Sequence, residues 1–242
     1  MQIRSSARRS AAGALKRVLG RLHLFLHFFS SVRRRGLLRT VKIAWFELYY
    51  ERRFGVATGI IIQRHELDGD ADALQHSVDY FPSSYLILNE IFVRGPIDCR
   101  DRILVDFGCG LGRALLFLST LPFKQIIGVE FSPTLAAAAE VNLQRLYAKE
   151  KREKPQWSVI NADARNFPIP DEASVFYFFN PFDASVLGKV LDNILESVRR
   201  SPRPCAIVYA NAVHAEEMAA RNMQPLSWPA KDFTIYMIDG SA

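Results

Sequence analysis

The chain has 242 residues, of which 49% are hydrophobic and 23% are charged; this composition excludes wholesale disorder and allows one sizeable core. Its apolar runs fall well short of the ~20 residues that a membrane-spanning helix needs. Three cysteines without a CxxC pair argue against a disulfide scaffold and a cysteine-rich zinc site, and favour a reducing compartment. The five histidines form no HExxH motif, so no metal is expected.

The net charge of +6 is concentrated at the start of the chain. Residues 1–46 hold eleven lysines and arginines and no acidic residue, whereas the rest of the chain holds 20 basic and 25 acidic residues. Apolar residues recur at helical spacing over 15–29 and again over 37–48, which predicts a basic helical extension over residues 1–58. Three interpretations stay open: an anchor for an anionic membrane surface or nucleic acid, a helical cap packed on the main domain, and a targeting peptide.

Residues 59–242 are predicted to form one domain. A connector leads to a helix with Tyr85, Leu88, Ile91 and Phe92 as its apolar positions, which Ser83 or Ser84 can cap. Strand-like and helix-like runs then alternate, which predicts an α/β fold with a doubly wound, mostly parallel sheet. The expected strands are 103–107, 125–130, 157–160, 174–179, 205–209 and 233–238, and the expected helices are 113–120, 134–149, 184–200 and 214–221. No helix follows the last strand, which is therefore a candidate for antiparallel pairing.

A glycine loop after the strand at 103–107 is the most informative segment. Gly108, Gly110 and Gly112 alternate there, and a helix follows, so backbone N–H groups can approach a ligand closely. A Walker A loop is excluded because Gly112 is followed by Arg113 rather than Lys, and Arg113 also takes the place of the third glycine of a dinucleotide fingerprint. Asp106, two residues before the first glycine, would repel a pyrophosphate and attract an ammonium group. A ligand with an ammonium, a nucleoside and no phosphate is predicted, and S-adenosylmethionine fits.

The segment from Val105 to Gly112 resembles the first motif of the class I S-adenosylmethionine-dependent methyltransferases, and the resemblance covers roughly residues 80–240. Gly128–Ser132 resembles the second strand of that family with its terminal acid, and Asn161–Ala164 resembles its adenine-proximal segment. The resemblance implies a Rossmann-like sheet of seven strands. It also implies that Glu130 accepts from the ribose hydroxyls and that Asp163 accepts from the adenine amine. The cofactor-binding residues expected here are Asp106, Gly108, Gly110, Gly112, Glu130, Phe131, Asp163 and Ala164.

A second motif, Asn180-Pro181-Phe182, ends the fourth strand. It resembles the Asn/Asp-Pro-Pro-Tyr/Phe motif of amino-group methyltransferases, with one proline instead of two. The resemblance makes these three residues the catalytic candidates, with Asn180 orienting an acceptor nitrogen beside the cofactor. Asn180 is also expected to be a cofactor-binding residue. The alternative is a plain Asn-Pro turn.

Upstream, Tyr80 and Pro82 resemble a segment that closes over the cofactor in some protein-lysine methyltransferases of this fold, and both are expected to bind it. The overall pattern is most similar to bacterial methyltransferases of unassigned substrate. His65, His76 and His214 are expected to be surface or capping groups.

The sequence therefore predicts an enzyme that transfers a methyl group from S-adenosylmethionine to an acceptor, with a nitrogen of a protein side chain or a small molecule as the favoured acceptor. Two alternatives are a non-catalytic S-adenosylmethionine-binding protein and, less favoured, a nicotinamide-dependent oxidoreductase. The expected location is cytoplasmic, with peripheral membrane or nucleic-acid contact through the basic extension.

Overall fold

The computed structural model describes residues 36–151 and 156–240. It divides into two compact units, one ending at Leu48 and the other beginning at Tyr49. Helix α2 (Leu37–Phe54) spans this division and confirms the second helical pattern of the extension. The first pattern, over 15–29, lies outside the described residues. Among the helices that the structure describes, none is long and apolar enough to cross a membrane.

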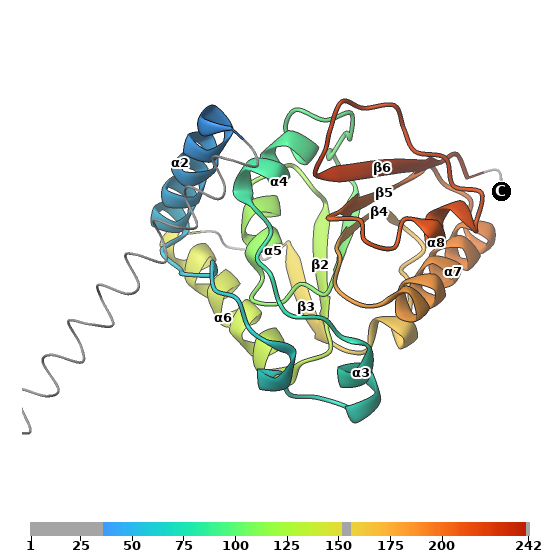
Figure 1. The fold of residues 1–242 in the computed structure, drawn as a ribbon, viewed down its shortest axis with the longest axis horizontal. Coiled ribbons are helices and arrows are strands. Elements are labelled where there is room, and N and C mark those ends of the chain that lie inside the picture. Colours follow the sequence, from blue (N-terminus) through green and yellow to red (C-terminus); the bar gives the residue numbers. More distant parts are fainter. Residues whose placement is uncertain (1–35, 152–155, 241–242) are drawn as a thin grey trace, which may run out of the picture. The chain divides into compact units, whose positions relative to one another are not determined.

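The second unit is built around one sheet with the strand order β3-β2-β1-β4-β5-β6. Neighbouring strands are parallel except β6, which runs antiparallel to β5. This arrangement confirms the predicted doubly wound, mostly parallel sheet and its antiparallel last strand (Figure 1). The strands are β1 (Ile103–Phe107), β2 (Gln125–Glu130), β3 (Trp157–Asn161), β4 (Ala173–Phe179), β5 (Cys205–Ala210) and β6 (Phe233–Ile238).

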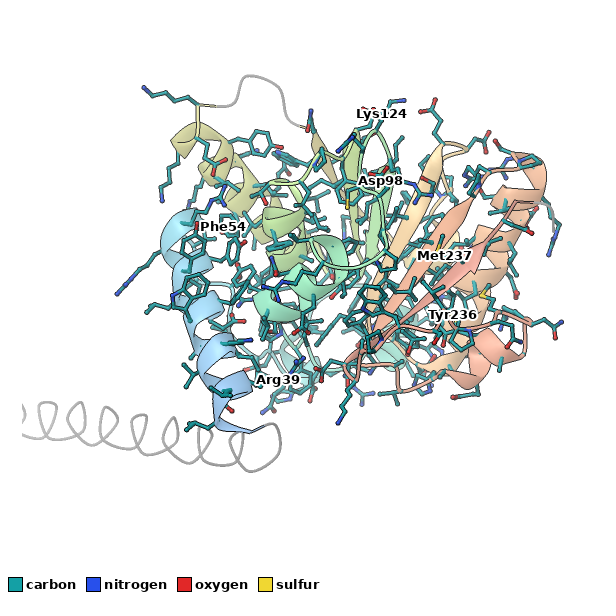
Figure 2. The ribbon with its side chains drawn as sticks, turned by 90° about the horizontal axis from the view of Figure 1, so that it is seen from above. Arg39, Phe54, Asp98, Lys124, Tyr236 and Met237 are labelled. Atoms are coloured by element: carbon teal, nitrogen blue, oxygen red, sulfur yellow. The ribbon has the colours of Figure 1, made fainter. Side chains whose placement is uncertain are left out.

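A seventh strand, which the family resemblance implied, is not found among the described residues. Between β5 and β6 the chain forms the short helix α8 (Glu216–Ala219) and a loop that contains Pro225 and Pro229. Proline has no N–H to donate to a sheet, so this loop is a poor strand. It meets β6 where the Leu226 N–H donates to the Ile235 carbonyl at 2.7 Å. On β6 itself Tyr236 is buried and Met237 is 48% exposed (Figure 2).

Helices cover both faces of the sheet (Figure 1). Those on one face are α4 (Tyr85–Phe92), α5 (Arg113–Leu118) and α6 (Pro133–Lys149), and α7 (Ala184–Arg200) and α8 lie on the other. The predicted helix positions are confirmed, with ends that differ by a few residues. The sequence analysis did not predict α3 (Ala71–His76) or the short 3₁₀ turns η1 (Arg64–Glu66) and η2 (Ala164–Asn166).

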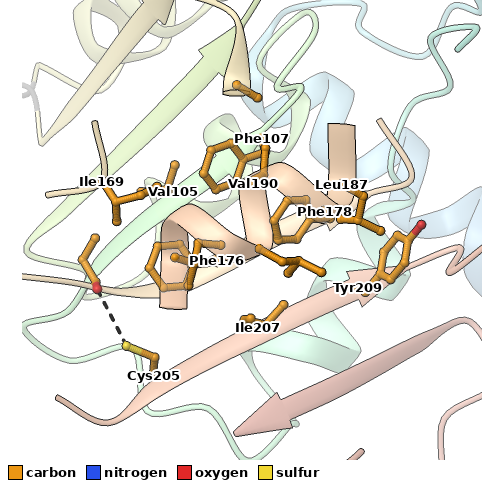
Figure 3. Close-up of a cluster of buried hydrophobic side chains, with 14 of the residues drawn as sticks. Val105, Phe107, Ile169, Phe176, Phe178, Leu187, Val190, Cys205, Ile207 and Tyr209 are labelled. Atoms are coloured by element: carbon orange, nitrogen blue, oxygen red, sulfur yellow. Dashed lines mark hydrogen bonds between the residues drawn. The ribbon is translucent and has the colours of Figure 1, made fainter. Parts of the chain in front are cut away.

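The apolar core beneath α7 fixes the strand ends that matter for the site. Phe107 of β1 and Phe178 of β4 stack with ring centroids 5.0 Å apart, and Leu187 and Val190 of α7 belong to the same buried cluster (Figure 3). Both rings are fully buried, and such close packing leaves little room for the backbone to shift. The polar residues that follow β1 and β4 therefore leave the sheet from fixed points.

Candidate functional site

A cleft opens where the parallel strands end at their carboxyl termini, which is the usual ligand position in open α/β sheets. It encloses about 880 Å³, counted with its open mouth. One wall comes from the ends of β1, β2, β3 and β4, and the other comes from the segment 67–83. The predicted residues that line it are Tyr80, Asp106, Gly108, Glu130, Phe131, Asp163, Ala164, Asn180, Pro181 and Phe182.

Three predicted cofactor residues do not line the cleft. Gly110 lies beneath Tyr80, since a Cβ on it would stand 2.1 Å from the Tyr80 ring. Gly112 faces Ala139 of α6, where a Cβ would stand 3.0 Å from the alanine Cβ, so it serves helix packing. Pro82 is half-buried beside the cleft wall. Gly110 and Gly112 have φ values of 54° and 76°. Glycine adopts such positive φ values without strain, so these two residues give the loop its shape.

Asp106 is the buried acid of the glycine loop. Its side chain is 3% exposed and lines the cleft, and its Oδ2 atom has no hydrogen-bond partner among the described residues. Burial, with a smaller contribution from the charge of Glu130, raises the pKa of Asp106 to about 8. A buried acceptor without a donor is costly, and a ligand ammonium would both donate to it and favour its ionised form.

Glu130 ends β2 and is 4% exposed. Its Oε2 accepts from the Gly110 N–H at 2.9 Å, and its Oε1 accepts from the Ser132 N–H at 3.0 Å. Burial raises the pKa of Glu130 although these two bonds oppose it. Each carboxylate oxygen has a second lone pair, so the group can still accept from two neighbouring hydroxyls. Asp106 and Glu130 together thus fit a ligand with an ammonium at one end and a ribose at the other.

Asp163 is already paired within its own loop. Its Oδ1 accepts from the Arg165 backbone N–H at 2.8 Å and from Arg165 Nε at 3.1 Å, and its Oδ2 accepts from Nε at 2.9 Å. Burial raises the pKa of Asp163, but the bonds from Arg165 outweigh it and the net shift is downward. Arg165 Nη2 also pairs with Asp72 at 2.6 Å. Asp163 could thus accept from an adenine amine only if Arg165 gave up part of this contact.

The transfer motif is assembled at the end of β4. Asn180 has φ 45°, and its Oδ1 accepts from the hydroxyl of Tyr209 at 3.0 Å. Pro181 packs over Gly108, where a Cβ would stand 2.3 Å from the proline Cβ. Phe182 is buried against Phe178, with ring centroids 6.1 Å apart. The structure therefore brings the predicted transfer residues beside Gly108 and Asp106, and it adds Tyr209, which the sequence analysis treated only as part of an apolar strand.

The segment 67–83, here called the strap, supplies the second wall. Asp68 accepts from the hydroxyls of Ser132 and Thr134 at the start of α6. His76, which was expected to be a surface or capping group, lines the cleft instead, and its Nδ1 lies 2.6 Å from Asp183 Oδ2. Burial raises the pKa of Asp183, but the bond to His76 and the other contacts outweigh it and lower the pKa. The Asp-Gly-Asp turn at 68–70, with Asp70 as the helix cap, was the signal that could have revealed α3.

Arg113 fastens the carboxyl end of the strap. This guanidinium is 2% exposed and lies 3.9 Å from the centre of the Tyr85 ring. Its Nε donates to the Ser83 carbonyl at 2.8 Å, and its Nη1 donates to Thr58 Oγ1 at 2.9 Å. The residue that breaks the dinucleotide fingerprint is therefore a buried anchor next to the glycine loop.

No group of three or more histidine, cysteine or acidic side chains in the described part of the chain could hold a metal ion. All three cysteines are free and buried.

Residues 104–204, from β1 to the residue before β5, match the family model of the methyltransferase domain. No curated protein sequence matches the chain.

Three similar solved structures are methyltransferases. One is a S-adenosylmethionine-dependent methyltransferase from Aquifex aeolicus, with 13% identity, a TM-score of 0.44 and coverage of 57% of this chain and 83% of that one. Another is an RNA methyltransferase from Salinibacter ruber with S-adenosylhomocysteine, with 19% identity, a TM-score of 0.46 and coverage of 64% and 91%. The third is the magnesium protoporphyrin IX methyltransferase of Synechocystis PCC 6803, with 11% identity, a TM-score of 0.41 and coverage of 58% and 70%.

The family match includes β2, β3, β4 and most of β1, and the predicted site residues Asp106, Glu130, Asp163 and Asn180 lie at or just after the ends of these strands. A methyltransferase domain is consistent with the way in which the buried carboxylates of Asp106 and Glu130 fit S-adenosylmethionine. Residues 104–204 are therefore similar to a methyltransferase domain, and the buried carboxylates among them fit S-adenosylmethionine as its cofactor.

Proposed function

We propose that this domain transfers the methyl group to a nitrogen atom, on a protein side chain or a small molecule. The observation that supports this acceptor is the placement of Asn180, Pro181 and Phe182 in one cleft with Asp106. A nitrogen acceptor keeps N–H hydrogens while its lone pair attacks, and it needs hydrogen-bond acceptors to aim that lone pair. Asn180 Oδ1 has a second lone pair beside the one that Tyr209 uses. It can therefore accept one of those hydrogens.

Other residues of the cleft would hold the cofactor or exclude water from it. Bound S-adenosylmethionine supplies a sulfonium methyl, and the transfer itself needs mainly alignment and a dry site. Asp106 would hold the ammonium and Glu130 the ribose hydroxyls. Phe182 and the apolar wall behind it would flank the nitrogen-bearing group and keep solvent away.

The acceptor is tested with methyl-labelled cofactor against cell protein, small amines, RNA, lipids and small hydroxyl compounds. We expect labelled product from a protein or amine fraction, and mass spectrometry should place the methyl on nitrogen. A methyl group found on oxygen, sulfur or carbon would contradict the nitrogen acceptor. Cofactor binding without turnover on any fraction would favour the non-catalytic binding protein.

Binding is measured in parallel by calorimetry, so that a failed acceptor screen can be interpreted. Glu130→Ala should weaken S-adenosylhomocysteine binding by about 1–3 kcal/mol, because the ribose hydroxyls lose a charged acceptor. Glu196→Ala is the matched control, since Glu196 is exposed on α7. NAD should not bind. Tight NAD binding without S-adenosylhomocysteine binding would support the oxidoreductase instead.

A further inference from the structure

We propose that Tyr209 is a positioning residue for methyl transfer, and that its hydroxyl fixes the orientation of the Asn180 side-chain amide. The proposal rests on the function proposed above, in which Asn180 aims the acceptor nitrogen. It goes further because it assigns a task to a fully buried core residue that does not line the cleft. Its basis is a chain of two hydrogen bonds that runs from a backbone N–H through Tyr209 to Asn180.

The burial of Tyr209 shows that its hydroxyl needs a specific partner. The residue lies near the end of β5, its side chain is fully buried, and its ring meets Phe178 edge to face at 6.3 Å. Its neighbours in the buried cluster are mostly Phe, Val, Ile and Leu. A phenylalanine at position 209 would therefore pack against them equally well, and packing does not explain the hydroxyl. Figure 3 shows the hydroxyl oxygen pointing away from the cluster. A buried phenol is stable only where that oxygen finds a hydrogen-bond partner.

The direction of both hydrogen bonds follows from the chemistry of the groups. The backbone N–H of His214 can only donate, and it donates to the Tyr209 oxygen at 3.3 Å. The Tyr209 hydrogen is then free to point at Asn180 Oδ1, 3.0 Å away. Burial raises the pKa of Tyr209, so the hydroxyl keeps this hydrogen at neutral pH. Oδ1 of Asn180 is thereby turned toward Tyr209, and the amide is held in one orientation.

Holding this orientation has a chemical consequence at the cleft. A free Asn side chain can rotate by half a turn, which exchanges its oxygen acceptor with its NH₂ donors. An NH₂ group in the place of Oδ1 would repel the N–H hydrogens of an acceptor instead of binding them. Asn180 also sits in the left-handed backbone region, at φ 45°, which asparagine tolerates but does not favour. The bond from Tyr209 selects the productive arrangement before the acceptor arrives, which is preorganisation of the site.

A double-mutant cycle tests the proposal on an acceptor found in the screen. Tyr209→Phe keeps the ring and removes the hydroxyl, and we expect it to lower kcat by about 10-fold or more. The KM for the acceptor and the affinity for S-adenosylhomocysteine should stay within about 2-fold, because Tyr209 touches neither. Asn180→Ala should lower kcat by ~10²-fold or more. In the Asn180→Ala background, Tyr209→Phe should have no further effect, since its target is gone.

A second readout needs no acceptor. The side-chain NH₂ signals of Asn180, assigned by NMR from their loss in Asn180→Ala, should shift in Tyr209→Phe. Tyr236→Phe is the matched control, because Tyr236 is also a buried tyrosine but its side chain hydrogen-bonds to Thr234, and it should leave both the signals and kcat unchanged.

The outcomes separate this proposal from the one on which it rests. Equal losses from Tyr209→Phe in both backgrounds, or unshifted Asn180 signals, would overturn the positioning role while the Asn180 role stands. Wild-type turnover by Asn180→Ala would remove Asn180 from the transfer site, and both proposals would then fail.

Discussion

Asp106, which we propose holds the ligand ammonium, carries a cost to folding. Its carboxyl is buried, its Oδ2 has no partner in the described structure, and its pKa is raised to about 8. Without a ligand, the folded protein therefore keeps the Asp106 proton at neutral pH. The unfolded chain releases that proton near the ordinary pKa of 3.8. A cationic ligand group would favour the ionised form and would release the proton on binding.

The stability of the folded protein should consequently depend on pH at this residue. The folded state holds more protons than the unfolded state between about pH 4 and pH 8, so the contribution of Asp106 to the free energy of unfolding falls as pH rises through that window. Asp106→Asn removes this dependence. We expect the variant to be more stable than the wild type at pH 8, with a smaller difference at pH 5, in urea unfolding monitored by circular dichroism.

Two comparisons make this test specific. Glu196→Gln changes an exposed carboxylate on α7 and should leave the pH dependence as in the wild type. The same Asp106→Asn protein should bind S-adenosylmethionine more weakly. If Asp106→Asn is less stable than the wild type at pH 8, the Asp106 carboxylate has a hydrogen-bond or ionic partner in solution, and the prediction is wrong.

At the scale of elements, one buried cation joins segments that are distant in sequence. Arg113, in the first turn of α5, holds the Ser83 carbonyl, the Thr58 hydroxyl and the Tyr85 ring. It also pairs with Glu51 at 3.4 Å, near the end of α2. Burial lowers the pKa of Arg113 to about 10, so the guanidinium is still charged at neutral pH. These contacts fasten residues 51–58 and the strap to the helix that follows the glycine loop.

Arg113→Met should therefore lower the free energy of unfolding by about 2–4 kcal/mol, because buried acceptors lose their donor while the aliphatic stem is kept. Urea unfolding measures the change. Arg145→Met alters an exposed arginine of α6 and should change stability by less than about 0.5 kcal/mol. Equal stabilities for the two variants would mean that water replaces the guanidinium without cost, and that the anchor has no energetic role.

The elements that sequence reasoning predicted well are those with a strong periodic signal. The continuous apolar run 175–179 predicts a central strand, and β4 is found there. The helical pattern predicted over 184–200 coincides with α7. Helix α3 was missed because its six residues are too few to show a period.

Contacts made across the fold could not be predicted in the same way. Arg165 donates hydrogen bonds to the Asp163 carboxylate. The Tyr209 hydroxyl donates to Asn180 from β5, a strand whose sequence is apolar and shows no sign of a functional residue. In each case the partner is recognisable only when the strand ends are brought together. Most of the predicted site residues line the cleft, whereas the residues that hold them in place were not predicted.

For the whole molecule, the unequal distribution of charge remains the main feature outside the cleft. The described part of α2 exposes apolar side chains between its basic residues, with Leu38 82% and Trp45 58% exposed. We propose that the basic extension binds an anionic membrane surface, because positive charge beside exposed apolar side chains is the pattern of interfacial helices. The cluster of Arg33, Arg34 and Arg35 lies outside the described residues.

Vesicle sedimentation tests this proposal on the full chain. Vesicles with an anionic phospholipid should pull the protein down, neutral vesicles should not, and added salt should release it. Reversing the charges of Arg33, Arg34 and Arg35 to Glu should reduce the bound fraction several-fold, while reversal of the exposed Arg199 on α7 should not. Binding that is unaffected by the triple reversal, or that is seen only with RNA, would rule out the membrane role.

The strap has a kinetic consequence for the catalytic cycle. It forms one wall of the cleft and is fastened by Asp68 at α6, by Asp72 at Arg165 and by His76 at Asp183. A cofactor bound behind this wall would have to pass these contacts on entry and on release, so the opening of the strap would be a step of the catalytic cycle separate from the methyl transfer.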